Sequence, residues 1–143
     1  AHPAVAQCAV VAEPDAYAGE VPAAFVVLRA GAAVDADALL REVAPAVYER
    51  PAVPKRVVVV EALPLTAIGK VFKPALRLRA IELKLSDLAR ELAPGRAAQV
   101  QAREEGGRQR ATVTFAGAPD DVLADRLQAA LAAIAVPTDV RFS

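Results

Sequence analysis

The sequence is poor in the residues that build disulfides and metal sites. It has a single cysteine, Cys8, a single histidine, His2, and neither methionine nor tryptophan. One thiol cannot form an internal disulfide, and a lone imidazole without neighbouring cysteines offers no metal-ligand spacing. We therefore expect no structural metal and no disulfide framework, which is typical of a protein of the reducing cytoplasm.

Charge of one sign and long apolar runs are also missing. The 17 basic and 17 acidic side chains give a formal net charge of zero, so no long-range field attracts nucleic acid or an anionic membrane. The apolar runs are far shorter than the roughly 20 residues of a membrane-spanning helix. We expect no nucleic-acid partner, no membrane span and no targeting leader. The start at Ala1, without methionine, is typical of an excised fragment, and a processed start has the same appearance.

Apolar residues are abundant and make up 55% of the chain, which is enough for the core of one domain, or of one small domain with an appendage. Segments 5–12, 21–29 and 55–61 are rich in small and β-branched residues and are predicted strands. Cys8 lies in the first of these and is expected to be a buried, inert thiol. Segment 14–20 is long for a tight hairpin, so we expect a shaped surface loop there.

A helix is predicted between the second and third strands. Asp35 or Asp37 can cap it, and apolar side chains recur at helical spacing as far as Arg50. Pro45 favours a kink or an early stop. These elements together predict an α+β fold with a small mixed β-sheet flanked by helices.

The stretch that follows Lys73 is predicted to form one helix or two short ones and to end at Pro94-Gly95. This stop precedes a polar, charged stretch and is the best candidate for an internal boundary. We therefore divide the chain into a domain of residues 1–93 and an extension of residues 94–143.

The extension has the pattern of a ββαβ unit. Segments 98–104 and 109–115 alternate in part and flank Gly106-Gly107, which predicts a hairpin. A helix is expected to start at 119–121 and a last strand at 138–142. Two roles stay open for the extension, which are added strands for the sheet and a surface for homo-oligomerisation. The predicted apolar stripe of the helix consists of Val122, Leu123, Leu127, Ala130, Leu131 and Ile134.

Segment 64–73, PLTAIGKVFK, carries the most chemistry. Gly69 frees the backbone of this predicted strand-to-helix loop, and Lys70 is displayed on it. An ammonium on a flexible stem suits a site where a carboxylate attacks a phosphate and negative charge accumulates. Taken alone, the segment also fits a solvated loop lysine.

The same segment resembles the signature P-x-T-x-x-G-K-x-x-K of the adenylate-forming (AMP-binding) enzymes, a family that includes acyl-CoA synthetases, firefly luciferases and peptide-synthetase adenylation domains. Other short segments occur in the order and spacing of that family's C-terminal lid domain. The resemblance covers roughly the first 80 residues, and several separated motifs in the correct order make chance agreement improbable. The supporting segments are 2–5 (HPAV), 10–11 (VV), 14–15 (PD), 19–27 (GEVPAAFVV), 53–57 (VPKRV) and 76–77 (LR).

The resemblance implies a two-step acid–thiol ligase that uses ATP, Mg²⁺ and CoA and passes through an acyl-adenylate. In this family the C-terminal domain rotates over a large N-terminal domain between the steps. Carried over, Lys70 is the catalytic residue of adenylation, and Gly69 lets the loop enter the site. Thr66 and Lys73 complete the expected substrate-binding residues, with Thr66 stabilising the loop through its hydroxyl.

The large domain is the expected partner, with acyl-adenylate and CoA bound at the domain interface. Its phosphate loop is missing from this sequence, so we expect the isolated chain to be catalytically silent. Two alternatives stay open. The chain could belong to an adenylation domain that loads a carrier protein, or it could be a non-catalytic binding or assembly module.

Overall fold

The computed structural model describes residues 3–32, 34–47 and 54–143. Its internal contacts separate two compact units. The N-terminal unit comprises Ala1–Glu13 and Glu20–Arg77, and the C-terminal unit comprises Pro14–Gly19 and Leu78–Ser143. The division into residues 1–93 and 94–143 stays a prediction. No helix in the described part of the chain is both long and apolar enough to cross a membrane.

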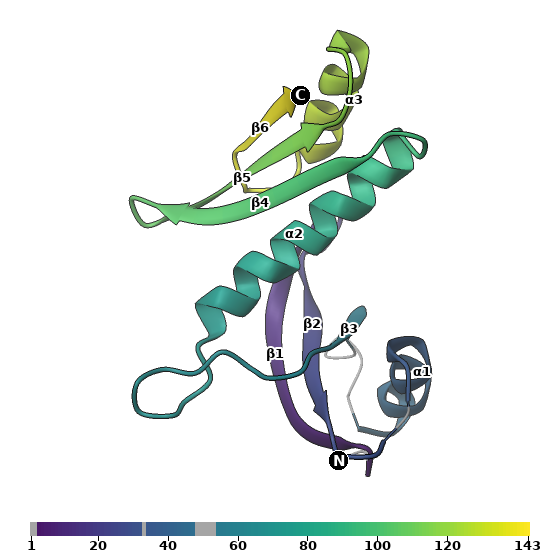
Figure 1. Cartoon of the computed structure of the whole chain (residues 1–143), viewed down its shortest axis with the longest axis vertical. Helices are drawn as coiled ribbons and strands as arrows, with labels where there is room; N and C mark the ends of the chain where they lie inside the picture. Colours follow the sequence, from purple (N-terminus) through teal and green to yellow (C-terminus); the bar gives the residue numbers. More distant parts are fainter. Residues whose placement is uncertain (1–2, 33, 48–53) are drawn as a thin grey trace. The chain divides into compact units, whose positions relative to one another are not determined.

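The N-terminal sheet has the strand order β1-β2-β3 (Figure 1). β1 (Val5–Asp15) and β2 (Gly19–Leu28) are hydrogen-bonded neighbours joined by only three residues, so they run antiparallel. β3 (Arg56–Val59) is parallel to β2, with Ala23 opposite Arg56. The sheet is therefore small and mixed, which confirms the predicted fold class.

The first turn differs from the prediction. β1 continues through Asp15 rather than ending at residue 12, so the expected shaped surface loop is wrong. The reason is the carboxylate of Asp15, which accepts hydrogen bonds from the backbone N–H groups of Tyr17 and Ala18 at 3.1 and 2.8 Å. Such a side-chain-to-backbone turn reverses the chain within a few residues.

Burial along β1 begins at Ala9, the fifth of its 11 residues. Cys8 is exposed, so the prediction of a buried thiol is wrong. Ala9, Val11 and Glu13 are buried, as expected for one face of a strand. The buried carboxylate of Glu13 accepts a hydrogen bond from the guanidinium of Arg56 on β3, which satisfies its charge inside the unit.

Helix α1 (Ala36–Val47) is capped by Asp35, whose carboxylate accepts the backbone N–H of Ala38 at 2.7 Å. Of the two predicted caps, Asp35 is therefore the one used. The helix continues past position 45, so the predicted early stop is wrong. The expected end at Arg50 lies outside the described residues.

The C-terminal unit has a second sheet in the order β4-β5-β6 (Figure 1). β4 (Ala98–Glu105) and β5 (Arg108–Phe115) form an antiparallel hairpin, and β6 (Thr138–Phe142) is parallel to β5. The predicted ββαβ order is confirmed. Gly106 and Gly107 take φ of +58° and +79°, the two positive values that a two-residue hairpin turn of type I′ needs.

Helix α3 (Asp121–Leu131) and helix α2 (Lys73–Leu92) from Leu78 onward complete this unit. Alternate residues of β5 are fully buried, and they share one core with the apolar faces of α2 and α3. Val122 was predicted in the apolar stripe of α3 but is 70% exposed. The stripe is centred on Leu123, Leu127 and Leu131, and Val122 lies about 100° around the helix from Leu123.

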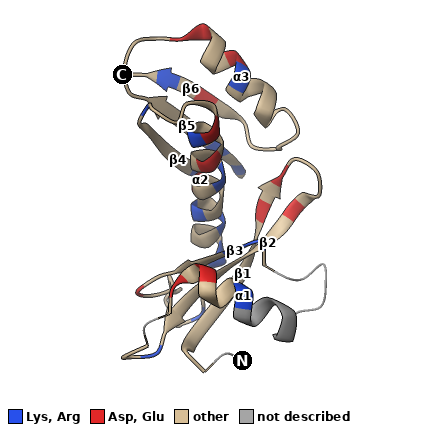
Figure 2. Cartoon of the chain, turned by 90° about the vertical axis from the view of Figure 1, so that its right-hand side faces the viewer, with Lys and Arg blue, Asp and Glu red and all other residues tan. Residues whose placement is uncertain are grey.

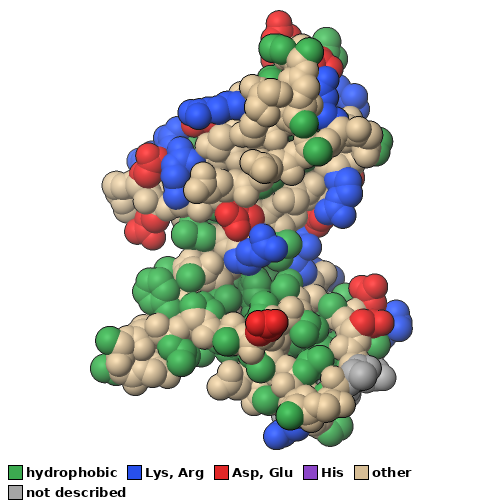
Figure 3. Space-filling view, viewed as in Figure 1, with side chains coloured by type: hydrophobic (Ala, Val, Ile, Leu, Met, Phe, Trp, Pro, Cys, Tyr) green, Lys and Arg blue, Asp and Glu red, His purple; other side chains and the backbone are tan. Residues whose placement is uncertain are grey.

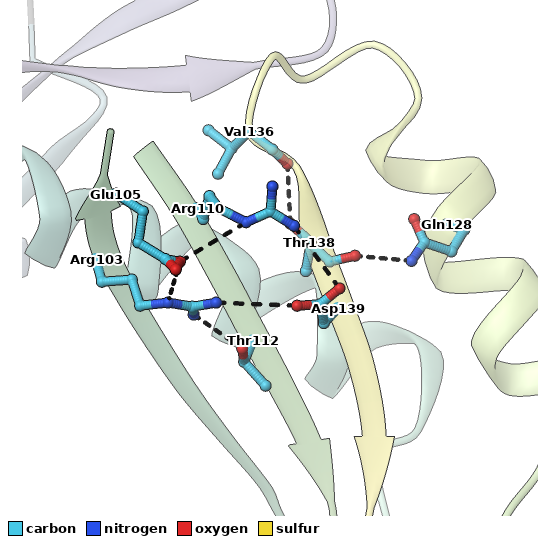
Figure 4. A network of polar contacts seen from close by, with 8 residues as sticks. All are labelled: Arg103, Glu105, Arg110, Thr112, Gln128, Val136, Thr138 and Asp139. Carbon is cyan, nitrogen blue, oxygen red and sulfur yellow. Dashed lines mark hydrogen bonds and ion pairs between the residues drawn. The ribbon is translucent and has the colours of Figure 1, made fainter. Parts of the chain in front are cut away.

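Charged side chains lie on the surface of the C-terminal unit. Basic and acidic residues are interspersed along α2 and α3 (Figure 2). On the sheet, Arg103 and Arg110 lie directly opposite each other, a like-charge pairing that is unfavourable by itself. Glu105 and Asp139 bridge the two guanidinium groups, with the shortest contact, Arg103 Nε to Glu105 Oε2, at 2.9 Å (Figure 4).

Candidate functional site

The signature loop, residues 64–73, is folded as a small hairpin. Leu65 and Val71 form an isolated antiparallel bridge. The backbone N–H of Phe72 donates to the carbonyl of Pro64 at 2.7 Å, which adds a second rung beside the bridge. The loop therefore has a defined backbone of its own.

The tip of the hairpin is closed around Thr66 and Lys70. Thr66 N–H donates to the Lys70 carbonyl at 2.7 Å, and Gly69 N–H donates to the Thr66 carbonyl at 3.0 Å. The Thr66 hydroxyl in turn accepts the Lys70 N–H at 3.2 Å. Gly69 has φ of +85°, a left-handed conformation that a three-residue hairpin loop requires at its last position.

The side chain of Lys70 takes no part in this ring of hydrogen bonds, because only its backbone atoms do, and the residue is exposed. No described residue forms an ion pair or a hydrogen bond with its ammonium group. Other cations of the chain are paired, such as Arg90 with Asp87 at 2.7 Å. Lys70 is thus a solvated cation on a backbone that its own loop holds in place.

Lys73 lies outside this ring. It is the first residue of α2, and it is exposed. Together with Arg77, one helical turn later, it lines a shallow groove whose other wall comes from β1 and β2. The structure therefore brings three of the four predicted residues, Thr66, Gly69 and Lys70, into one turn, and places Lys73 beside a separate groove.

Three apolar residues of the loop were not singled out from the sequence. Leu65, Ile68 and Phe72 are 59%, 79% and 45% exposed. Figure 3 shows hydrophobic side chains gathered over the N-terminal unit. A solvated loop is normally polar, so three large apolar residues in a predicted loop were the sequence signal that could have identified them.

Metal-ligating clusters are missing from the described residues. Within residues 3–32, 34–47 and 54–143, no group of three or more His, Cys, Asp or Glu side chains could hold a metal ion. The chemistry that these residues offer is electrostatic. One mobile primary ammonium on a structured hairpin can approach and neutralise an anion.

The fold and the loop thus define a small α+β domain that displays Lys70 on a hydrogen-bonded hairpin. The AMP-binding enzyme C-terminal domain family matches residues 1–70. The chain is also similar to a medium/long-chain-fatty-acid–CoA ligase of Mycobacterium tuberculosis, with 50% identity over 84 residues, which covers 54% of this chain and 15% of that protein. A 2,3-dihydroxybenzoate–AMP ligase of Bacillus subtilis is 45% identical over 87 residues, covering 59% and 15%.

Among solved structures, an acyl-CoA synthetase of Brucella canis is 35% identical with a TM-score of 0.53, over 58% of this chain and 16% of that one. Residues 1–70 therefore belong to the C-terminal domain of the adenylate-forming family, as the signature indicated. The chain spans about 15% of the length of the two curated relatives. Residues 71–143 lie beyond the part that the family matches.

Proposed function

We propose that the chain is the C-terminal domain of an acyl-CoA synthetase, an acid–thiol ligase for a fatty or related carboxylic acid, and that Lys70 is its adenylation residue. The observation that carries the proposal is the solvated ammonium of Lys70 on a hydrogen-bonded hairpin. It stands at the lysine of the family signature. The similarity to a fatty-acid–CoA ligase supports the same reaction class.

In the first step, a carboxylate oxygen attacks the α-phosphorus of ATP, a new O–P bond forms and pyrophosphate leaves. The carboxylate and the phosphate are both negative, so their approach is opposed by charge repulsion. The Lys70 ammonium would lie between a carboxylate oxygen and an α-phosphate oxygen, aligning the attack and neutralising the developing charge. Removing one such donor costs about 10²- to 10³-fold in rate.

In the second step, the thiol of CoA attacks the acyl carbon, the thioester forms and AMP leaves. Lys70 has no role in this step, because the domain has rotated by then and presents its opposite face. That face of the N-terminal unit helps to form the thiol channel. The two steps therefore differ in their dependence on Lys70.

The other residues of the site have supporting roles. Thr66 and Gly69 shape the hairpin through the hydrogen bonds and the positive φ described above. Lys73 adds a second positive charge for contact with the anionic substrate.

The remaining components belong to the full-length enzyme. The large N-terminal domain would hold ATP, AMP and the acyl group, and CoA would enter between the domains. Mg²⁺ would be held by residues other than those described here, since these offer no cluster of metal ligands. The isolated chain is then catalytically silent, and we place the enzyme in the cytoplasm.

The test separates the two half-reactions in the full-length enzyme. Lys70→Ala should lower ATP–pyrophosphate exchange by about 10²- to 10³-fold and leave thioester formation from supplied acyl-adenylate close to wild type. Lys73→Ala is the matched control, because it removes an exposed lysine of the same loop and should lower exchange far less. Equal loss of both half-reactions, or of neither, would contradict the role of Lys70.

A carrier protein is the second candidate acceptor. It is favoured by the similarity to a 2,3-dihydroxybenzoate–AMP ligase, whose name includes no CoA. Supplying acyl-adenylate with either CoA or a phosphopantetheine-loaded carrier protein discriminates the two acceptors. Faster transfer to the carrier protein would replace CoA in the proposal, whereas transfer to neither would favour a binding or assembly module.

A further inference from the structure

We propose that the C-terminal unit carries a binding site for a phosphorylated sugar. The site is a groove of about 470 Å³, lined by side chains of α2, β4 and β5 between positions 79 and 114. This volume lies within the roughly 300–1,000 Å³ of small-molecule sites. The inference does not rest on the proposed function, because the groove lies beyond residues 1–70, the part of the chain that the family matches.

Two cross-strand pairs form the floor of the groove. Gln99 lies opposite Thr114, and Gln101 lies opposite Thr112 in the ladder of β4 and β5. These four residues therefore share one face of the sheet, on which side chains repeat about every 7 Å along each strand. The intervening Val113 is fully buried, so the floor lies on the face that is turned away from the core.

Most polar groups of the floor are free to bind a ligand. No residue in the described part of the chain hydrogen-bonds the side chains of Gln99, Gln101 or Thr114. The Thr112 hydroxyl accepts Arg103 Nη1 at 3.0 Å and keeps its own proton to donate (Figure 4). Hydroxyls and carboxamides both donate and accept hydrogen bonds, as sugar hydroxyls do. The floor therefore matches a polyhydroxylated ligand.

The wall of the groove supplies a positive charge. Arg79 and Ser86 line it from α2, two helical turns apart. The Arg79 side chain is 56% exposed, and its contact with Glu82 is long, at 3.5 Å. Glu82 also accepts the Ala102 N–H at 3.0 Å, which places α2 beside the edge of β4. Arg79 is therefore weakly held and can turn toward an anion in the groove.

The composition of the lining selects the class of ligand. Among the described residues, Arg79 is the only charged one in the lining, which favours an anion. A guanidinium pairs with two phosphate oxygens at once, and a phosphate monoester carries about −1.5 to −2 charges at pH 7. Val100 is the only apolar side chain in this lining, and none is aromatic, so neither an acyl chain nor a stacked base is matched. A phosphate carried on a sugar fits both the wall and the floor.

Arg79→Gln in the full-length enzyme is the first test, with glucose 6-phosphate and inorganic phosphate as probes. α,β-Methylene-ATP is present throughout, so that the nucleotide site of the large domain is occupied. Phosphorus NMR titration measures each dissociation constant, and Arg79→Gln should weaken both probes about tenfold or more. Arg126→Gln is the matched control, because it removes an exposed arginine of α3 outside the groove; it should change neither. Equal binding of glucose 6-phosphate to wild type and Arg79→Gln, or no binding below about 10 mM, would overturn the inference.

A second variant separates the sugar from the phosphate. Thr114→Val removes one hydroxyl and keeps the shape of the side chain. It should weaken glucose 6-phosphate by about 2- to 10-fold and leave inorganic phosphate unchanged. Equal effects on the two probes, or inorganic phosphate that binds as tightly as glucose 6-phosphate, would show that the groove does not recognise a sugar.

The same chemistry could come from a free sugar phosphate or from a nucleotide sugar, and UDP-glucose distinguishes the two sources. The ligand class is the one whose probe binds more tightly and weakens in Arg79→Gln. Lys70→Ala, which tests the proposed function, should leave the binding of all three probes unchanged. Either proposal can therefore fail while the other stands.

Discussion

The two units of the chain differ in how their large apolar side chains are exposed to water. In the N-terminal unit Leu65, Ile68, Phe72 and part of Val59 are left in water. In the C-terminal unit the apolar faces of α2 and α3 and one face of β5 close over a single continuous core. The contrast lies in the signature loop of the N-terminal unit, which leaves three large apolar side chains exposed within eight residues, whereas the exposed apolar residues Tyr17 and Val122 of the C-terminal unit stand singly.

Polar groups show the same contrast. Both free edges of the second sheet are capped by side chains from the helices: Glu82 accepts the Ala102 N–H at 3.0 Å, and Gln128 donates to the Thr138 carbonyl at 2.9 Å. Such caps oppose pairing with another strand. In the N-terminal unit the signature loop satisfies its backbone but leaves the Lys70 side chain to the solvent. The two contacts occupy one backbone group on each edge strand of the second sheet and disfavour strand pairing at those two positions.

The largest expected effect is a loss of stability, and it differs between two phenylalanines, Phe115 and Phe72. Phe115→Ala should lower the free energy of unfolding of the chain by about 3–5 kcal/mol, because Phe115 is fully buried in the core and stacks on Phe142. Phe72→Ala should cost less than about 1 kcal/mol, because Phe72 is half exposed. Urea unfolding measures both. An equal loss of unfolding free energy in the two variants would contradict the difference in burial between the core of the C-terminal unit and the signature loop.

The next effect compares two glycines, Gly69 and Gly19, which both have positive φ and open space where a Cβ would lie. Replacing either with alanine should destabilise the chain by about 1–2 kcal/mol, because the left-handed conformation is strained for other residues. Only Gly69→Ala should also lower ATP–pyrophosphate exchange in the full-length enzyme, since it distorts the hairpin that carries Lys70. An equal loss of exchange in Gly19→Ala would show that the loss follows from general destabilisation and not from the hairpin that carries Lys70.

The smallest effect concerns the sheet edge. Glu82→Ala should lower the free energy of unfolding by about 1 kcal/mol, since the Ala102 N–H loses its carboxylate partner. Glu91→Ala is the control on the same helix, because Glu91 is exposed, and it should be nearly neutral. Sedimentation of Glu82→Ala should also reveal whether the uncapped edge of β4 now pairs with a second copy. If Glu82→Ala leaves both the free energy of unfolding and the sedimentation unchanged, Glu82 neither stabilises the chain nor protects the edge of β4.

Secondary structure was most predictable where turn chemistry is encoded by glycine. The Gly106-Gly107 pair fixed the second hairpin to within one residue at each inner end. The first hairpin was predicted wrongly as a longer loop. The carboxylate of Asp15 accepts the hydrogen bonds that form its turn. In a sequence, an aspartate with this role looks the same as any polar loop residue. Exposure of Cys8 and Val122 was also misjudged, since burial depends on tertiary packing.

At the site, the signature named candidate residues but not the contacts that hold them. Thr66, Gly69 and Lys70 were expected together, whereas the hydrogen bonds that close their turn depend on three-dimensional geometry. The exposure of the apolar residues Leu65, Ile68 and Phe72 was not predicted, because burial depends on tertiary packing. Their exposure became visible only with the fold.

The most direct test of the account follows the Lys70 amine itself. The full-length enzyme is treated with an acetylating reagent with and without α,β-methylene-ATP and a fatty acid, and Lys70 is compared with the exposed Lys55 in the same sample. We expect acetylation of Lys70 to slow at least tenfold in the presence of both ligands while Lys55 is unchanged. An unchanged rate at Lys70 would contradict the delivery of this cation to the adenylation site.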